Sequence, residues 1–156
     1  MSSSTDWLDM SVPASVRINS AVAVGRMAVV AAGPVGLALG LEGLPNFFQK
    51  WCRVLMEMPD DEEKVDACMG VVLVSKAYPQ AVVSDQETLR FLAHAFLSWD
   101  SEVANALNAT LMNEFRDLFQ GFAKQMGPQS WNQLKMSWGG GAATDLRERL
   151  QAAFGV

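Results

Sequence analysis

The stretch VANALNATLMNEFRDLFQGFAKQM, residues 103–126, decides the fold class of this chain. Its apolar side chains recur every three or four residues, which places them on one face of an α-helix. These side chains are Val103, Leu107, Leu111, Phe115, Leu118, Phe119, Phe122 and Met126. The spacing predicts one continuous helix over residues 101–126, the longest element of the chain.

Helical periodicity extends from this stretch through almost the whole sequence, without the alternation that is typical of strands. Capping-box spacing, in Asp60 with Glu63 and in Ser84 with Glu87, marks two helix starts, and Pro59 ends a helix. The predicted helices cover residues 11–32, 44–58, 60–77, 85–99, 101–126, 128–137 and 143–154.

These helices form pairs that begin near residues 11, 60 and 101. A helix pair that repeats every ~40–47 residues is the period of HEAT and armadillo repeats. The pattern therefore predicts an all-α fold of about three antiparallel helix pairs, arranged as a fragment of a HEAT-repeat α-solenoid. A closed helical bundle has similar loops and remains the alternative on periodicity alone.

The composition is that of a globular, acidic chain. Half of its 156 residues are hydrophobic, 19% are charged, and the formal net charge is -5. Lys and Arg are scattered, and the tightest group is the pair Arg147 and Arg149, so the basic stripe that direct nucleic-acid binding requires is missing. Cys52 and Cys68 lie in apolar helical patterns, and we predict that they are reduced core residues.

An uncharged segment, MAVVAAGPVGLALGL, runs from Met27 to Leu41. It is shorter than the ~20 residues that a membrane span needs, and Gly33-Pro34 interrupts it. No association with a membrane is therefore predicted.

The most concentrated charge is the run Asp60, Asp61, Glu62 and Glu63. A bound cation needs carboxylates that converge from several directions, whereas these four fan around the first turn of one predicted helix. The helix dipole stabilises carboxylates at such a position. We interpret the run as a helix cap with a solvated face, and contact with a basic partner remains the functional alternative.

No group of residues in the sequence has the pattern of a catalytic or cofactor site. His94 is the only histidine, and no nucleophile and orienting group accompany it. The glycines between Gly33 and Gly43 do not have the spacing of a phosphate-binding loop. We therefore predict no enzyme activity, no cofactor and no metal site.

The five tryptophans divide by their place in the helical pattern. Trp51, Trp99 and Trp131 occupy apolar-periodic positions and are predicted to lie in the core. Trp7 and Trp138 lie near predicted helix ends, where either burial or exposure is compatible with the pattern.

Several ordered stretches of the chain have a common family resemblance. They are Asn19 to Arg26 (NSAVAVGR), Trp51-Cys52 with Leu55, Asp60 with Glu62-Glu63-Lys64, Ala67 and Gly70, Ser98-Trp99, Gly121-Phe122 with Gln125, Gly127 and Trp131, Leu146 to Leu150 with Ala152, and Gly155-Val156. In this order and spacing the chain resembles the transportins, nuclear import receptors of the importin-beta (karyopherin) family. The positions expected to be structural are Gly25, Arg26, Trp51, Gly70, Trp99, Gly121, Phe122, Trp131, Leu146 and Leu150.

The resemblance implies that the chain is a C-terminal segment of such a receptor, with HEAT repeats at about 11–58, 60–99 and 101–156. Residues 1–10 are then expected to be disordered or not native. Departures from the family pattern lie at 31–43, 105–109 and 139–143, which places the helix ends there in doubt.

The resemblance implies that the chain acts by binding other proteins. In this family the full-length receptor binds cargo proteins with basic nuclear-localisation signals, binds Ran GTPase through its N-terminal arch, and shuttles between cytoplasm and nucleus. The Ran site is not expected in this chain, which would support the cargo-binding arch and cap the solenoid. The alternative is a self-contained helical bundle that binds an apolar small molecule in an enclosed cavity.

The predicted helix 11–32 is apolar around much of its circumference. In a solenoid fragment one side of the first helix pair is an exposed apolar patch, and self-association of the isolated chain is expected. Complete burial of this helix by the rest of the chain would contradict the fragment interpretation.

Overall fold

The computed structural model describes residues 6–40, 42–99, 101–140 and 142–156, and within these ranges the regular structure is entirely helical. The all-α prediction is therefore confirmed for the described chain. The elements are a 3-10 turn η1 (Asp6–Leu8) and the helices α1 (Ala14–Leu39), α2 (Leu44–Glu57), α3 (Glu62–Ala77), α4 (Pro79–Val83), α5 (Gln86–Phe96), α6 (Ser101–Met126), α7 (Pro128–Ser137) and α8 (Ala142–Phe154).

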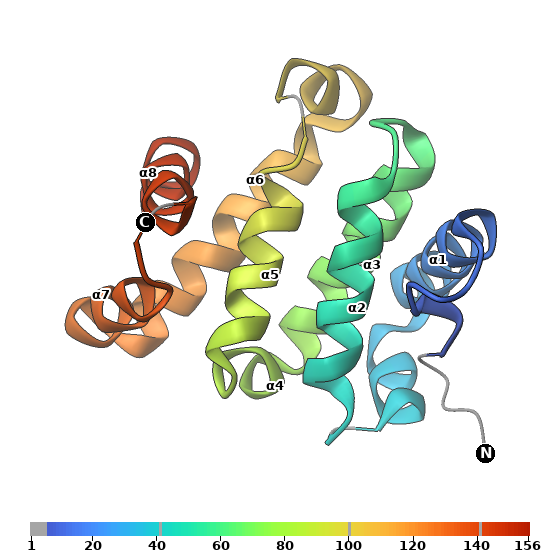
Figure 1. The fold of residues 1–156 in the computed structure, drawn as a ribbon, viewed down its shortest axis with the longest axis horizontal. Helices are drawn as coiled ribbons and strands as arrows, with labels where there is room; N and C mark the ends of the chain where they lie inside the picture. Colours follow the sequence, from blue (N-terminus) through green and yellow to red (C-terminus); the bar gives the residue numbers. More distant parts are fainter. Residues whose placement is uncertain (1–5, 41, 100, 141) are drawn as a thin grey trace.

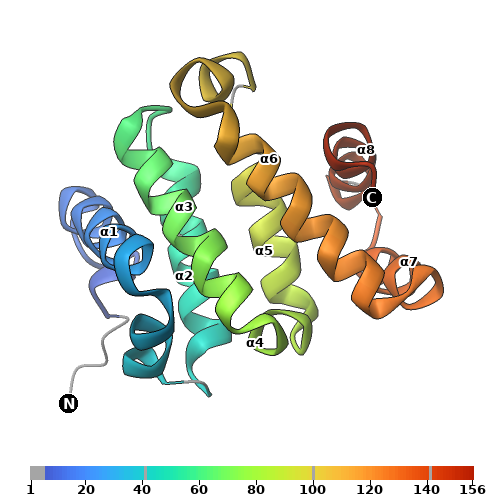
Figure 2. The same cartoon turned by 180° about the vertical axis from the view of Figure 1, so that it is seen from behind.

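The long helices stack in two layers (Figures 1 and 2). Helices α1, α3 and α6 pack side by side in one layer, and α2 packs against α5 in the other. Helix α8 contacts both α5 and α6 at the far end of the stack. Consecutive antiparallel helices thus alternate between layers, as in a HEAT-like α-solenoid, and the predicted fold class is correct.

Two of the predicted helices contain a break that the periodicity did not reveal. Helix α1 continues to Leu39 instead of ending at residue 32, but Ala31 has a non-helical backbone (φ -149°, ψ 64°). Pro34 explains this break, because its ring excludes the carbonyl of residue 30 from the helical position. In α6 the predicted continuous helix is wrong at Asn108 (φ -162°, ψ 92°), whose side-chain oxygen accepts from the Thr110 amide at 3.1 Å.

Both predicted helix caps lie one residue too early in the sequence. The N-cap of α3 is Asp61, which accepts from the Lys64 amide at 3.0 Å, and the N-cap of α5 is Asp85, which accepts from the Glu87 amide at 2.9 Å. An N-cap residue has an extended backbone. Asp61 and Asp85 have that conformation, whereas Ser84 is still α-helical (φ -72°, ψ -14°).

The described part of the segment 1–10 packs against the rest of the chain. Leu8 in η1 is 2% exposed and belongs to the core. The guanidinium of Arg17 donates to the carbonyls of Met10 and Val12, and Lys50 pairs with Asp9 at 3.7 Å. Residues 1–5 lie outside the described chain.

The core contains the aromatic and sulfur side chains that the periodicity places there. Trp51, Trp99 and Trp131 are buried, as predicted, and Cys52 and Cys68 are buried free thiols. Burial raises the pKa of the Cys68 thiol to about 12, so the thiol stays protonated and unreactive in the folded chain.

The two remaining tryptophans differ from each other. Trp7 is exposed, which is compatible with its place near a helix end. Trp138 is buried, and its indole donates to the Gln86 carbonyl at 3.3 Å, which joins the end of α7 to the start of α5.

Candidate protein-interaction surfaces

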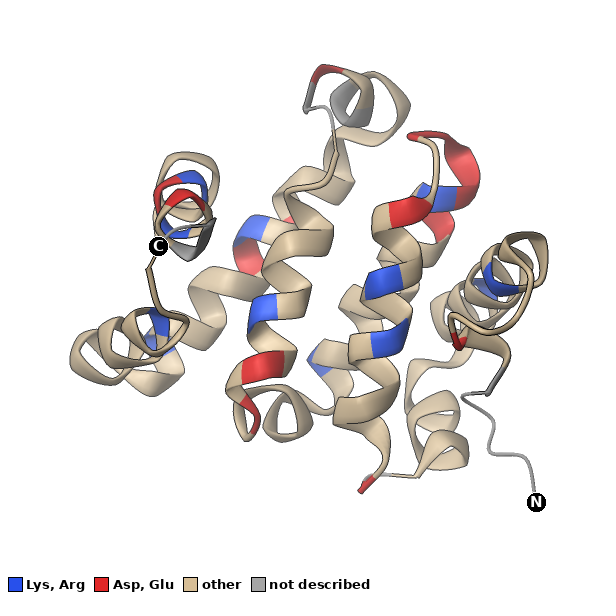
Figure 3. Cartoon of the chain, in the orientation of Figure 1, with Lys and Arg blue, Asp and Glu red and all other residues tan. Residues whose placement is uncertain are grey.

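Figure 3 shows the acidic run at the start of α3. Its members differ in burial, from the partly buried Asp60 to the exposed Glu62 and Glu63. Asp60 is turned inward, where its carboxylate lies 2.8 Å from the ammonium of Lys64. Lys64 is only 1% exposed, donates to the Ser98 hydroxyl at 3.1 Å, and lies 4.6 Å from the centre of the Trp99 ring. The Asp60–Lys64 pair is therefore partly buried: the Lys64 ammonium lies inside, and the Asp60 side chain is 25% exposed.

The other three carboxylates have separate roles. Asp61 caps α3, whereas Glu62 and Glu63 are exposed on its first turn, where the helix dipole favours negative charge. Contact of the run from Asp60 to Glu63 with a basic partner stays a prediction, and Glu62 and Glu63 are the most exposed residues of the run. Within the described ranges, no group of three or more His, Cys, Asp or Glu residues is arranged to hold a metal ion.

Most of the positions that carry the family resemblance gather in two clusters. The first lies where α1 crosses α3. A methyl group on Gly70 would lie 2.5 Å from the Cα of Gly25, so only glycines allow this approach. Beside the crossing, the Arg26 guanidinium donates to Asp66 at 2.9 Å, and the Trp51 indole donates to a backbone carbonyl of α1 at 3.2 Å.

The second cluster joins α6, α7 and α8 around Phe119. The Phe122 and Trp131 rings meet the Phe119 ring edge-on at centroid distances of 6.1 and 6.3 Å. Leu146 and Leu150 on α8 are buried in the same hydrophobic core. Trp99 belongs instead with Cys68 and Lys64, and Gly121 is exposed with open space beside it, so these matched positions lie outside both clusters.

Helix α1 lies at one edge of the stack and leaves apolar side chains uncovered (Figure 1). Val30 is 88% exposed, Leu37 is 64% exposed and Met27 is 54% exposed. A hollow of about 330 Å³, bordered by Trp7, Val16 and Met27 among others, runs along this side. We call the exposed α1 side chains of Val16, Met27, Val30 and Leu37 the α1 apolar face. Its exposure agrees with the expectation for the first helix pair of a solenoid fragment.

Helix α1 is longer than the uncharged segment from Met27 to Leu41. Ala14–Leu39 forms 26 residues of helix, and by length and composition alone this helix is able to cross a membrane. Its other features are those of a packed helix: the buried Arg17 pairs with Glu57 at 3.1 Å, and Gly25 lies directly against α3.

His94 is half-buried on α5 and makes no triad or ligand set with the residues that the structure describes. Burial lowers the pKa of His94 below its ordinary value of 6.5, and the positive charges of Arg90 and Arg149 lower it further. The folded chain therefore holds the neutral imidazole to a lower pH than the unfolded chain.

A pH dependence of stability follows from this shift. Below pH 6.5 the unfolded chain binds a proton at His94 more readily than the folded chain, so the free energy of unfolding falls with acidification. We expect urea unfolding between about pH 7.5 and 5.5 to show this decline, and His94→Gln to reduce its slope. Identical slopes in the two chains would contradict the assignment.

Sequence reasoning missed the buried lysine. The signal was present, because Lys64 follows Asp60 by four residues, a spacing at which helical side chains meet. Such pairs are normally exposed and weak. Only the packing of α3 against the residues that follow α5 buries this one.

The fold and the described surfaces define a class of protein. It is a HEAT-like stack of helix pairs with an uncovered apolar edge, and the described residues assemble no catalytic group. The chain is 27% identical to transportin-1 of Mus musculus and of Homo sapiens over 144 residues, which is 92% of this chain. It is 30% identical to transportin-1 of Oryza sativa subsp. japonica over 115 residues, 74% of this chain. No family model matches the chain.

The matches cover only a small part of each relative. The chain spans 14% of the length of the two mammalian proteins and 12% of the rice protein. The chain is therefore related to a segment of transportin-1.

Proposed function

We propose that this chain is the C-terminal HEAT-repeat module of a transportin-like nuclear import receptor and that it acts by binding other proteins rather than by catalysis. The observation that carries the proposal is the combination of a two-layer helical stack with similarity to transportin-1 over 92% of the chain. In this role the module supports the cargo-binding arch and caps the solenoid.

The two ends of the stack differ in a way that supports the capping role. The α1 apolar face lies at one end, where a neighbouring helix pair would cover it. At the other end α8 exposes Asp145 and Glu148, which gives a polar outer surface of the kind that closes a repeat array. In the isolated chain the α1 apolar face is expected to drive self-association.

Cargo proteins and Ran GTPase are expected to bind the full-length receptor that contains this module. Cargo proteins with basic nuclear-localisation signals are its partners, with Glu62 and Glu63 as candidate contacts in this chain. Ran GTPase is expected to bind elsewhere in the receptor, and the module is expected to shuttle with it between cytoplasm and nucleus.

A titration of signal peptides separates support from direct cargo binding. Basic peptides that end in Pro-Tyr are titrated against this chain and against a full-length receptor that contains it. For a supporting and capping module we expect binding to the receptor and none to the chain. Binding to the chain that Glu62→Gln with Glu63→Gln weakens would instead assign it a cargo contact, and absence of binding to both proteins would contradict the proposed receptor.

The alternative of a bundle that binds an apolar small molecule requires an enclosed cavity. The hollows that the structure shows along the described residues lie open at the surface, and several have charged side chains on their walls. They do not favour that alternative.

A further inference from the structure

Some basic side chains of the described chain form an ion pair with an Asp or Glu side chain, and others do not. Those that form ion pairs all lie on α1, α2, α3 and α5, and they are Arg17, Arg26, Lys50, Lys64, Lys76 and Arg90. Among the residues described, no cation of α6, α7 or α8 lies within ion-pair distance of an Asp or Glu side chain, and the Lys135 ammonium donates to the backbone oxygen of Val156. The last three helices therefore present basic side chains that no described Asp or Glu contacts directly.

The net charge also differs between the two parts of the chain, as the colours of Figure 3 indicate. Residues 101–156 contain five Lys or Arg and five Asp or Glu, so the whole net charge of -5 belongs to residues 1–100. Long-range repulsion of an acidic partner is therefore weakest at the α6–α8 end of the stack.

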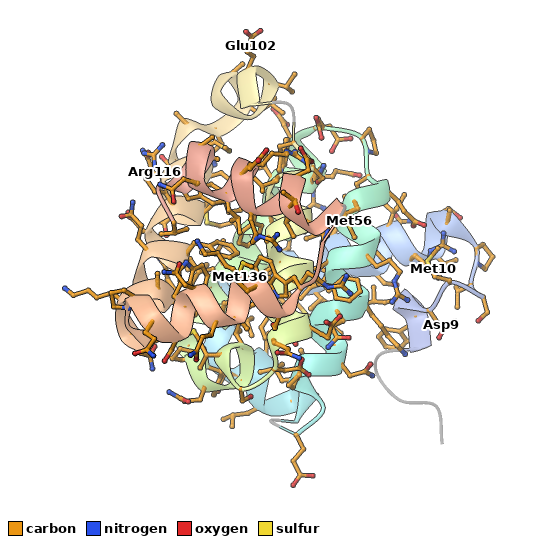
Figure 4. All side chains as sticks on the ribbon, turned by 60° about the vertical axis from the view of Figure 1, so that its left-hand side comes forward. Asp9, Met10, Met56, Glu102, Arg116 and Met136 are labelled. Atoms are coloured by element: carbon orange, nitrogen blue, oxygen red, sulfur yellow. The ribbon has the colours of Figure 1, made fainter. Side chains whose placement is uncertain are left out.

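Two of the unpaired cations border one hollow. A hollow of about 440 Å³ lies between the end of α5, α6 and α8, with Leu97, Trp99 and Met112 among its apolar walls and Arg116 and Arg149 beside them. Figure 4 shows Arg116 pointing outward from α6 at the surface of the molecule. We call this hollow the arginine groove.

The two guanidinium groups keep most of their donors available. Arg149 donates one N–H to the Leu97 carbonyl, which fixes its position at the C-terminal end of α5. Arg116 has a long contact of 3.5 Å to the Asn113 side-chain oxygen. A guanidinium has five N–H donors in a planar fork that matches a carboxylate, and both side chains are exposed.

We propose that the arginine groove binds an acidic segment of a partner protein. A carboxylate of that segment pairs with Arg116 and Arg149, and an adjacent apolar side chain covers the walls formed by Trp99 and Met112. Nucleic acid fits less well, because two arginines beside an apolar hollow do not make the continuous basic track that a phosphate backbone needs. This partner is distinct from the basic signals of the proposed function.

The probe is a short fluorescein-labelled peptide in which Asp and Glu alternate with Leu, and fluorescence anisotropy measures its binding to the full chain. Arg116→Gln and Arg149→Gln are each expected to weaken binding about ten-fold, because each removes a charge-assisted hydrogen-bonding group. Lys124→Gln is the matched control. Lys124 is also an exposed cation of α6 without a carboxylate within ion-pair distance in the described chain, but it lies beside a different hollow.

Further controls identify the chemistry of the partner. A peptide with Asn and Gln in place of Asp and Glu is expected not to bind. Higher salt is expected to weaken the binding of the acidic peptide. Circular dichroism verifies that each variant is folded. The proposal is overturned if the acidic peptide does not bind, if Lys124→Gln weakens it as much as Arg116→Gln, or if a single-stranded oligonucleotide binds the groove more tightly than the peptide.

Discussion

Gly70→Ala is expected to destabilise the chain by about 2 to 3 kcal/mol, since overpacking of a tight contact carries a cost of this order. The added methyl would lie 2.5 Å from the Cα of Gly25 and 2.6 Å from its carbonyl oxygen. Both neighbours are backbone atoms, so no side-chain rotation relieves the clash. Helices α1 and α3 must move apart instead, which loosens the most extensive helix–helix interface of the chain.

Gly121→Ala is the matched control for this substitution. Gly121 also lies inside a helix, but no atom comes within 4 Å of the position that its methyl would occupy. Gly121→Ala is expected to raise the free energy of unfolding by at most about 1 kcal/mol, because alanine favours a helix more than glycine does. Urea unfolding followed by circular dichroism measures both changes, and a Gly70→Ala chain as stable as the original would refute the close crossing.

Asp60→Asn is expected to cost about 3 kcal/mol, the loss typical of a buried charge that is left without its partner. The substitution keeps the size of the side chain but removes the charge that faces the Lys64 ammonium at 2.8 Å. Lys64 is 1% exposed, and among the described residues it also contacts the Ser98 hydroxyl and the Trp99 ring. Neither of them supplies a negative charge.

The same substitution at Asp66 gives the comparison. Asp66 also lies near the start of α3 and pairs with Arg26, but both side chains are about half exposed. Asp66→Asn is expected to cost less than about 1 kcal/mol, because water screens a surface pair. Denaturation midpoints of the two variants test the difference, and equal losses would mean that burial of Lys64 does not strengthen its pair.

The helical architecture was predictable because its signals are local. The apolar stripe of α6 and the proline that ends α2 each act within a few residues of sequence. The family resemblance added the helix-pair arrangement, which periodicity alone had left open between a solenoid and a closed bundle. The matched glycines acquired their explanation only when Gly25 and Gly70 were found in contact.

The errors at helix ends have local causes as well, but of a kind that periodicity does not detect. Asn108 offers its side-chain oxygen to the backbone and breaks α6 while the apolar stripe continues past it. At α3 and α5, two adjacent polar residues compete for the cap, and the one with an extended backbone takes it. Sequence spacing fits either neighbour.

The sequence by itself determined that the chain is all-α, where most helices lie, and many of the side chains that enter the core, because helix formation depends on neighbours three and four residues apart. Only the tertiary structure decided that Asp60 faces inward to Lys64, that Trp138 is buried, and that Arg116 and Arg149 meet at one hollow. Those outcomes depend on which helices pack together across long stretches of sequence. The spacing of residues along one helix does not contain that information.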